Sequence, residues 1–188
     1  MNLYSVDSCG VGYSMHASVF NLYTKHEKLG KGGFCSVYLV VHKLTNERCA
    51  MKKMEIEKVR PERLQTEINI LQDCVHENIV RYHQHFFEND KVYIVMELCP
   101  NGDLKAAIKY QKQCGEPFSE EQLLKWLHQM FKAIVYLHSK KIIHRDVKPG
   151  NILLSVTKDI KVADFNISKI QGTRKKISKK RILFFINN

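Results

Sequence analysis

One stretch constrains this chain more than any other, residues 142–154, which read IIHRDVKPGNILL. Apolar runs at both ends predict buried segments, and a short loop between them holds a His, an Arg, an Asp, a Lys and an Asn. Functional groups are often carried on loops that rigid elements hold in place, and shifted pKa values gather at such sites. We therefore expect a functional site here in preference to an ordinary solvated loop between two strands.

The composition indicates a globular, intracellular protein. The chain has 188 residues, enough for one domain with a core, and its contents of 44% hydrophobic and 26% charged residues are ordinary. The six cysteines are scattered with no C-x-x-C pair, which favours reduced thiols over a disulfide framework or a zinc site. No secretory signal pattern and no apolar run of membrane-spanning length is present. We expect a soluble protein of the cytoplasm, with the nucleus as an alternative.

The formal net charge of +11 is largely a property of one segment. Residues 174–181 hold six basic residues and no acid, so the rest of the chain carries +5. This segment, followed by the apolar residues 182–186, fits a nuclear-import or acidic-surface patch, a membrane-interface segment, or sequence without a selected function. Nucleic-acid binding is not expected, because aromatic residues are not interleaved with the basic ones.

Short apolar alternations predict an antiparallel sheet after a flexible leader, residues 1–22. The strands expected are residues 23–29, 37–41, 48–54, 76–80 and 92–98. His83 and His85 alternate near the fourth of these strands. With no third ligand in view, we interpret both histidines as structural and not as metal ligands.

Three helices follow from spacing and capping patterns. Residues 60–71 begin with a proline that suits a first helical turn, and Leu64 shares one apolar face with other residues at helical spacing. Asp103 is a suitable N-cap for a second helix. Residues 119–122 form a capping box, with serine answered by glutamine, and start a third, long amphipathic helix. Its expected apolar face consists of Leu124, Leu127, Phe131, Ile134 and Leu137, with Trp126 as a packing residue.

A glycine cluster at residues 30–33 lies between the first two strands. Glycines let backbone N–H groups approach phosphate oxygens closely, although a glycine-rich hairpin alone is more often just a turn. By the family resemblance set out below, Lys52 on the third strand would contact such phosphates and would need a carboxylate to hold it. The same resemblance makes Glu67, beside the apolar face of the first helix, the expected partner, and Glu62 is a less well placed competitor.

Together these motifs resemble those of the eukaryotic protein kinases. His144 to Asn151 match the pattern H-R-D-x-K-x-x-N, Asp164-Phe165 matches the start of D-F-G, and the glycine cluster precedes a lysine strand in the same order. Lys148 is typical of the serine/threonine branch, and the region of residues 102–126 is similar to the NIMA-related kinases. The resemblance covers about residues 23–169.

The resemblance implies an α+β, two-lobe kinase fold with a five-stranded antiparallel small lobe, one main small-lobe helix and an incomplete, mainly helical large lobe. Residues 23–98 would form the small lobe and residues 99–169 the start of the large lobe, with the catalytic loop and D-F-x. Residues 170–188 would be a basic and apolar tail that replaces the activation segment and the remaining large lobe.

The activity implied is transfer of the γ-phosphoryl group of ATP to a protein serine or threonine, with Mg²⁺ as cofactor. Asp146 would accept the hydroxyl proton and Lys148 would stabilise the transferring group. Asn151 and Asp164 would hold Mg²⁺, since phosphoryl transfer needs mainly positioning and charge neutralisation. The ATP-binding residues implied are Leu29, Gly30, Lys31, Gly32, Gly33, Val37, Ala50, Lys52, Glu67, Met96, Glu97, Cys99 and Leu153. A protein substrate and a regulatory protein are the expected partners.

Three departures from the family pattern support a second hypothesis. Cys35 stands where a third glycine is expected, and Asn166 replaces the glycine of D-F-G. No A-P-E motif follows, so part of the long helix would stay uncovered. The alternative is therefore a catalytically impaired, kinase-like fragment that binds nucleotide or a partner chain.

Overall fold

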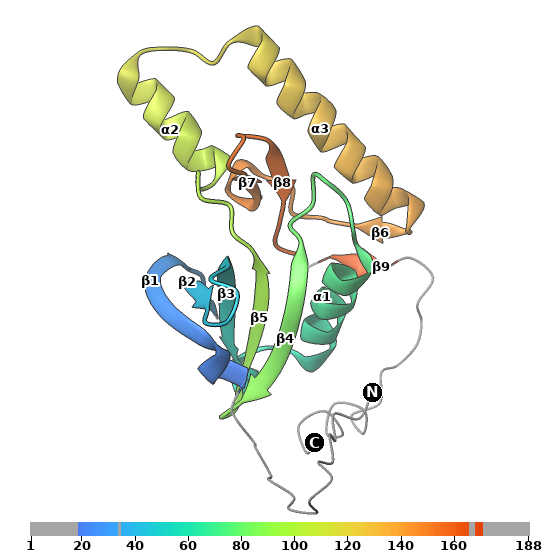
Figure 1. Cartoon of the computed structure of the whole chain (residues 1–188). Helices are drawn as coiled ribbons and strands as arrows, with labels where there is room; N and C mark the ends of the chain where they lie inside the picture. Colours follow the sequence, from blue (N-terminus) through green and yellow to red (C-terminus); the bar gives the residue numbers. More distant parts are fainter. Residues whose placement is uncertain (1–18, 34, 166–167, 171–188) are drawn as a thin grey trace, which may run out of the picture.

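A computed structural model describes residues 19–33, 35–165 and 168–170, and its larger part is an antiparallel sheet of five strands in the order β1-β2-β3-β5-β4 (Figure 1). The strands of this sheet are β1 (Tyr23–Lys31), β2 (Cys35–His42), β3 (Arg48–Glu55), β4 (Tyr82–Glu88) and β5 (Lys91–Glu97). Tight turns join β2 to β3 and β4 to β5, and Asn46, Asn89 and Asp90 adopt positive φ there, as Asn and Asp tolerate. The five-stranded antiparallel small lobe is confirmed.

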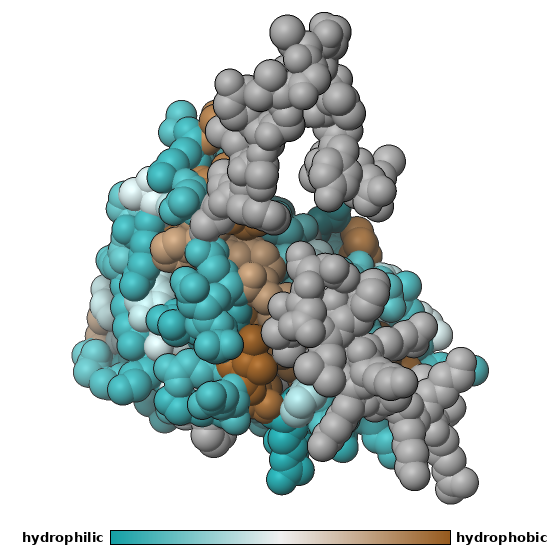
Figure 2. All heavy atoms as spheres, turned by 90° about the horizontal axis from the view of Figure 1, so that it is seen from below, coloured by the Kyte–Doolittle hydropathy of each residue, from teal (hydrophilic) through white to brown (hydrophobic). Residues whose placement is uncertain are grey.

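β5, an interior strand of this sheet between β3 and β4, is apolar on both sides. Val92 and Ile94 pack with the apolar face of α1 (Pro61–Asp73) in the main core, whereas Tyr93 and Val95 belong to a second cluster on the opposite face. The turn η1 (Val19–Leu22) packs against that second cluster through Phe20, whose ring centroid lies 5.3 Å from that of Tyr93. Viewed from the small-lobe end, hydrophilic side chains dominate the surface and apolar ones gather in a central region (Figure 2).

The fourth strand does not lie where the sequence predicts it. Residues 76–80 form a connecting segment, and β4 begins at Tyr82. Ile79 and Val80 are buried, but they are apolar because they pack beside β8 (Ile160–Val162), to which they also bond. Val80 N–H donates to Val162 O (3.0 Å), and Val162 N–H donates to Asn78 O (2.8 Å). An apolar run was thus correctly read as buried and wrongly read as sheet.

Two helices and two small sheets make up the second region, which lies above the five-stranded sheet in Figure 1. Its elements are α2 (Leu104–Cys114), α3 (Glu120–Ser139), β6 (Ile142–Ile143), β7 (Ile152–Leu154), β8 and β9 (Lys169–Ile170), with short 3-10 turns η2 (Ile56–Lys58) in the small lobe and η3 (Pro149–Asn151) before β7. β6 pairs with β9 and β7 pairs with β8, both antiparallel. These two strand pairs fix the ends of the polar loop of residues 144–151.

Both predicted caps form, one of them only in part. Asp103 caps α2 by accepting from Ala106 N–H at 2.7 Å, and Ser119 caps α3 by accepting from Gln122 N–H at 3.2 Å. The reciprocal half, in which the Gln122 side-chain oxygen would accept from Ser119 N–H, is not found among the described hydrogen bonds, and Gln122 Nε2 is buried without a partner among the described residues. The sequence correctly places the start of α3 and wrongly assigns the glutamine side chain.

The buried side of α3 differs from the expected one. Trp126, Ala133 and Leu137 are its buried residues, and Trp126 Nε1 donates to Lys158 O at 2.8 Å. Of the expected apolar face, Leu137 is buried and Ile134 half-buried. Leu124 and Phe131 are 57% and 59% exposed, as are their apolar neighbours Leu123 (49%), Leu127 (45%) and Val135 (66%). The helix therefore carries two apolar stripes, of which one is packed and one is open.

The fold is a kinase-type two-lobe arrangement with the five-stranded sheet in one lobe and few helices in the other. Most of the predicted leader and tail, residues 1–18 and 171–188, lies outside the described residues, as does Asn166. The predicted domain boundaries stay predictions. Among the described helices, none is long and apolar enough to cross a membrane.

Candidate active site

The first group of the site is centred on Lys52, in β3. Its Nζ lies 2.5 Å from Glu67 Oε1 on α1 and 3.3 Å from Asp164 Oδ1, which follows β8. Lys52 is 7% exposed and Glu67 3%. The sheet, the helix and the segment after β8 therefore meet at one cation, and Glu67 is the carboxylate that the sequence predicted as its partner.

Two opposing effects, burial and the nearby carboxylates, set the protonation state of Lys52. Burial alone would lower the pKa of its ammonium group, because it removes water from the charge. The carboxylates of Glu67 and Asp164 outweigh burial and raise that pKa above its ordinary value. Lys52 is consequently a fixed positive charge at neutral pH, suited to holding an anion such as a phosphate.

The second group lies in the polar loop between β6 and β7. Lys148 Nζ donates to Asp146 Oδ2 at 2.7 Å, and Asn151 Nδ2 donates to the same oxygen at 2.8 Å and to Asp146 O at 2.9 Å. These bonds, chiefly that from Lys148, lower the pKa of Asp146. Asp146 is thus an ionised carboxylate whose Oδ1 has no partner among the described residues.

His144 holds the polar loop in place through hydrogen bonds of both its ring nitrogens. Its Nδ1 accepts from Asp146 N–H at 3.2 Å, so its Nε2 carries the proton and donates to Ala163 O at 3.0 Å. Burial, above all, lowers the pKa of His144, which keeps the ring neutral as this bonding pattern requires. The ring of Phe165, which is fully buried, packs on it with centroids 4.9 Å apart.

Ala163 joins the two groups. Its N–H donates to Asn151 O at 2.9 Å, its carbonyl accepts from His144, and the next residue is Asp164. Asp164 has φ 66° and Arg145 has φ 67°, a left-handed backbone that costs energy for residues other than glycine. Such conformations persist where the surrounding structure imposes them, which is typical of functional sites.

Ser168 is a supporting residue that the sequence analysis missed. Its Oγ donates to His144 O at 3.0 Å, and its carbonyl accepts from Arg145 Nη2 at 3.3 Å. Ser168 is 6% exposed, so its hydroxyl group is shielded from water and stays hydrogen-bonded. No signal in the sequence marks it, because a serine near the end of a strand pattern is an ordinary surface residue.

The glycine-rich hairpin and the expected nucleotide-lining residues flank these groups. Gly32 N–H donates to Cys35 O at 2.9 Å, and a Cβ on Gly32 would lie 2.9 Å from Cys35 Sγ, so a side chain there would displace that sulfur. The other residues predicted to line a nucleotide site lie on several elements. They are Leu29, Gly30 and Lys31 in β1, Gly33 in the hairpin loop, Val37 in β2, Ala50 in β3, Met96 and Glu97 in β5, Cys99 after β5 and Leu153 in β7. No described bond joins this hairpin to the polar loop.

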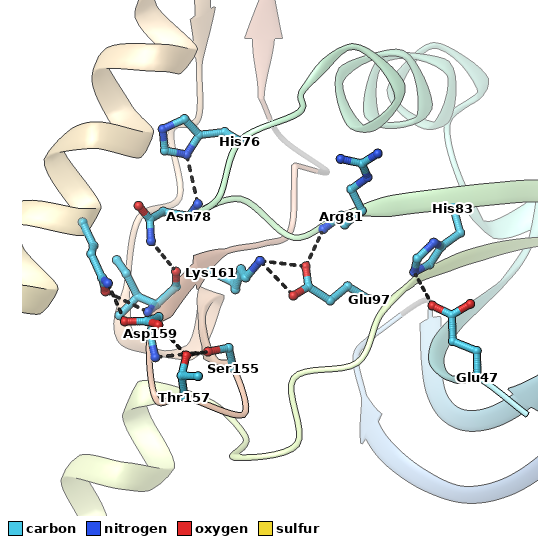
Figure 3. A network of polar contacts seen from close by, with 12 residues as sticks. Glu47, His76, Asn78, Arg81, His83, Glu97, Ser155, Thr157, Asp159 and Lys161 are labelled. Atoms are coloured by element: carbon cyan, nitrogen blue, oxygen red, sulfur yellow. Dashed lines mark hydrogen bonds and ion pairs between the residues drawn. The ribbon is translucent and has the colours of Figure 1, made fainter.

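The hinge, residues 97–99, connects β5 to the helical region. Glu97 N–H donates to Arg81 O at 2.8 Å, and the Glu97 carboxylate lies 2.8 Å from Lys161 Nζ and accepts from Arg81 N–H at 3.1 Å (Figure 3). The carboxylate is therefore occupied by a lysine of β8. The N–H of Glu97 is likewise occupied within the protein, by Arg81 O.

A cavity lies apart from these groups. Its volume is about 650 Å³, and it is lined by the hinge, the β7–β8 turn and α3. Its charged side chains are already paired, for instance Lys125 with Asp159 at 2.9 Å and Lys161 with Glu97. The catalytic-type groups around Lys52 and Asp146 do not line it, so size alone does not identify the site.

Oxygen donors suited to Mg²⁺ are available in this region. Asn151 uses its Nδ2 on Asp146, which leaves its Oδ1 as the atom for a cation, and the Asp164 carboxylate is about one-third exposed. Mg²⁺ prefers carboxylate and amide oxygens together with water and substrate phosphates. The residues present therefore fit this ion.

Comparisons with known proteins agree with this geometry. The family model of the protein kinase domain matches residues 23–183. A probable myosin light chain kinase from Dictyostelium discoideum is 40% identical over 152 residues, which is 80% of this chain and 47% of that protein. The serine/threonine-protein kinase pakH of the same organism is 40% identical over 149 residues, 78% of this chain and 28% of that protein.

A further relative is an Aurora kinase from Yarrowia lipolytica, 39% identical over 144 residues, which cover 74% of this chain and 38% of that protein. The matched region thus spans from about a quarter to a half of the length of these curated relatives.

Proposed function

This chain belongs to the protein kinase domain family, and on that premise we propose that it transfers the γ-phosphoryl group of ATP to serine or threonine hydroxyls of a protein. The observation that carries the proposal is the assembly of two charged groups through Ala163. One is Lys52 with Glu67 and Asp164, and the other is the polar loop of residues 144–151. A relative at 40% identity that is named a serine/threonine-protein kinase supports the substrate class.

Asp146 is the proposed base. Its lowered pKa keeps it ionised, and both side-chain donors engage Oδ2, so Oδ1 is the oxygen that would accept the proton of the substrate hydroxyl. Lys148, 56% exposed at its side chain, can remain on Asp146 or turn to a transferring phosphoryl group. Such a base acts mainly by orienting the hydroxyl for in-line attack.

Lys52 would bind phosphate oxygens of ATP, with Glu67 fixing its ammonium group from behind. Asn151 and Asp164 would hold Mg²⁺, which when bound bridges phosphate oxygens and neutralises the developing charge. The glycine-rich hairpin would cover the phosphates of ATP, and Val37 with Ala50 would enclose its adenine ring. These roles follow the family pattern at matching positions, and the contacts around Lys52 and Asp146 support them.

The identity of the substrate and of any regulatory partner is proposed only by class. We propose a protein substrate and a location in the cytoplasm, with the nucleus as the alternative. The nearer resemblance to NIMA-related kinases stays a prediction, since the relatives reported above carry other names. The proposal therefore extends to the serine/threonine branch without a subfamily.

A second candidate function is a module that binds nucleotide or a partner chain without turnover. The open apolar stripe of α3, which includes Leu124 and Phe131, favours it, because uncovered apolar surface of this kind marks association sites. In this case the groups around Lys52 would still bind ATP, whereas no phosphoryl group would be transferred.

The first experiment is phosphorylation of a generic protein substrate by the purified full chain with Mg²⁺ and ATP. Asp146→Asn removes the proposed base and should lower turnover by at least about a hundredfold, the lower range for general base catalysis. Asp73→Asn, at the exposed end of α1, is the matched control and should leave turnover unchanged. Turnover that is equal in both variants would refute the proposed role of Asp146.

The second experiment separates the two candidates by measuring Mg·ATP binding through thermal stabilisation. A ligand at one hundred times its Kd stabilises the folded state by about 2.7 kcal/mol. Stabilisation that is lost in Lys52→Met, without any phosphorylated product, would support the binding module. Stabilisation together with Asp146-dependent product would support the kinase.

A further inference from the structure

We propose that Glu47, Cys49 and His83 form a binding site for a zinc ion at the hinge end of the five-stranded sheet. One ligand atom from each residue, a carboxylate oxygen, the thiol sulfur and a ring nitrogen, lies within 4.8 Å of the other two. Figure 3 shows His83 and Glu47 facing each other, with His83 Nε2 3.9 Å from Glu47 Oε1. The site is separate from the catalytic groups and does not depend on the proposed function.

The structure supplies the ligands that the sequence did not reveal. His83 was interpreted as structural because no third ligand was visible near it, and 34 positions separate it from Cys49. Cys49 lies in β3 opposite Glu97 of β5, and His83 lies in β4 on the other side of β5. Folding therefore brings the two residues to the same end of the sheet.

An irregularity in β4 allows His83 to reach across. The pairing of β4 with β5 shifts between Tyr82 and Gln84, so His83 is the extra residue of a bulge. Bulges bend a strand and redirect a side chain out of the regular alternation. His85, the other histidine of β4, instead bonds Tyr82 through its Nδ1 at 2.6 Å. Only His83 is thus available on this strand as a ligand.

The other two ligands are held on a tight turn and the strand that follows it. His42 N–H donates to Glu47 O at 2.9 Å, and Glu47 N–H donates to Thr45 Oγ1 at 3.3 Å, so the Glu47 backbone is fixed at both ends. Residues two apart share one face of a strand, which places the side chains of Glu47 and Cys49 together. A rigid element of this kind is what a metal site requires.

The donor set selects zinc. Thiolate and imidazole are ligands that suit Zn²⁺ and not Mg²⁺ or Ca²⁺, and zinc also accepts a carboxylate oxygen in a tetrahedral site. Ligand atoms in such a site are about 3.5 Å apart, so the three must approach by about 1 Å. Glu47 and His83 are exposed and free to rotate, and solvent can supply a water as the fourth ligand. On binding, the Cys49 thiol loses its proton to solvent and the resulting thiolate bonds the metal.

An ordinary surface ion pair between His83 and Glu47 is the competing interpretation. A pair at 3.9 Å is long and would contribute about 0–1 kcal/mol. In that interpretation the Cys49 thiol only contacts Glu47 O, at 4.0 Å, whereas in the proposed site its sulfur bonds the metal. A measurement that detects the metal–sulfur bond therefore separates the two interpretations.

The test is titration of the purified full chain with Co²⁺ under reducing conditions, followed by optical absorption. A sulfur-containing tetrahedral site should give intense visible bands and a near-ultraviolet thiolate-to-cobalt band, in a 1:1 ratio, and Zn²⁺ should remove both. His83→Ala should weaken metal binding by at least about 10–100-fold, because removal of a group that only supports a ligand already costs that much in metal affinity. Cys49→Ser should abolish the near-ultraviolet band.

Matched controls are His26→Ala and Cys114→Ser, both at exposed positions outside the cluster, which should bind as the unaltered chain does. Because Cys49 is buried, circular dichroism must confirm that Cys49→Ser remains folded, and Glu47→Gln at an exposed position serves as a second ligand variant. The proposal is wrong if the thiolate band is absent from the unaltered chain. It is equally wrong if the band survives in both His83→Ala and Glu47→Gln.

Discussion

Lys52 shows how a buried charge is tolerated at the residue scale. Its ammonium group is almost fully buried, and two carboxylates surround it at 2.5 and 3.3 Å. Removing water from a charge costs several kcal/mol, and close, well-oriented partners offset this cost without an assured surplus. Such a pair is therefore better explained by the need for a fixed charge than by a gain in stability.

This balance gives a prediction for stability. Lys52→Met should lower the free energy of unfolding by about 3–5 kcal/mol, because Glu67 is left buried without its cation. The double variant Lys52→Met/Glu67→Leu should recover most of the loss, since an apolar pair of similar volume needs no water. Denaturant unfolding of the three chains measures the effect, with Lys53→Met as the control from the neighbouring position.

If the double variant were as unstable as Lys52→Met alone, burial of the unpaired carboxylate would not be the cause. The geometry of Lys52 itself would then be needed by the fold.

Acid sensitivity is expected from His144 and from two other histidines. Burial lowers the pKa of His144, His76 and His85 below the ordinary value of 6.5. The unfolded chain therefore binds more protons than the folded chain as the pH falls, so stability decreases with acidification. The contribution is complete above about pH 7 and is lost as the pH falls through 6.5 towards the lowered pKa values.

The measurement is the free energy of unfolding at several pH values between 7.5 and 5. In His144→Gln the slope of stability against pH should be smaller than in the unaltered chain, because one titrating group is gone. His138→Gln, at the exposed end of α3, is the control for the loss of an imidazole as such. An identical slope in all three chains would show that His144 titrates alike in the folded and unfolded states.

At the scale of elements, the buried face of α3 in the structure differs from the face that the sequence predicts. Two apolar stripes run along the helix, and periodicity cannot tell which one the rest of the chain covers. Trp126 lies under the helix against the β7–β8 turn, whereas Phe131 points away and is 59% exposed. The buried face is decided by tertiary packing and not by the number of apolar residues in a stripe.

Substitutions on the two stripes should therefore have unequal effects. Trp126→Ala should lower the free energy of unfolding by about 3–5 kcal/mol, the range for a large buried aromatic side chain. Phe131→Ala should change it by about 0.5 kcal/mol or less, as expected of an exposed residue. Thermal or denaturant unfolding measures both, and equal losses would show that the stripe of Phe131 is packed.

Much of the fold was predictable because several local signals agreed. Four strands, the proline-led helix α1 and both N-caps lie where the patterns placed them. The fourth strand of the prediction failed because the run at Ile79 and Val80 is buried by β8, whereas β4 itself begins with a polar run, residues 83–85. Burial makes a segment apolar whether or not it pairs in a sheet, so hydrophobicity alone could not separate the two cases.

The candidate site was predictable only as far as motif spacing reaches. Spacing pointed to Lys52, Glu67 and the polar loop, whose contacts are now described, whereas the roles of these residues stay proposals. Ser168 and the cluster of Glu47, Cys49 and His83 carry no pattern, because their members are brought together only by folding.

At the scale of the whole molecule, backbone bonds, side-chain bonds and the ion pairs of Lys52 with Asp164 and Glu97 with Lys161 connect the two lobes. Asn78 and Val80 bond β8, the hinge continues from β5, and Asn78 Nδ2 donates to Ile160 O at 3.1 Å. Asn78 Oδ1 is buried without a hydrogen-bond partner among the described residues. This junction therefore depends on a few exact contacts, and it lies close to the helix whose outer stripe is open.

That open stripe predicts self-association of this chain. Leu123, Leu124, Leu127, Phe131 and Val135 are each at least 45% exposed along one helix. Contiguous apolar surface of this kind lowers its free energy by burial against another surface, at about 25 cal/mol per Å². Sedimentation of the purified chain should show association that increases with concentration, and Leu124→Lys/Phe131→Lys should shift it towards monomer. Lys105→Ala/Lys109→Ala, at exposed sites on α2, is the control and should sediment as the unaltered chain does. A chain that stays monomeric at all concentrations would mean that the stripe is already covered in solution.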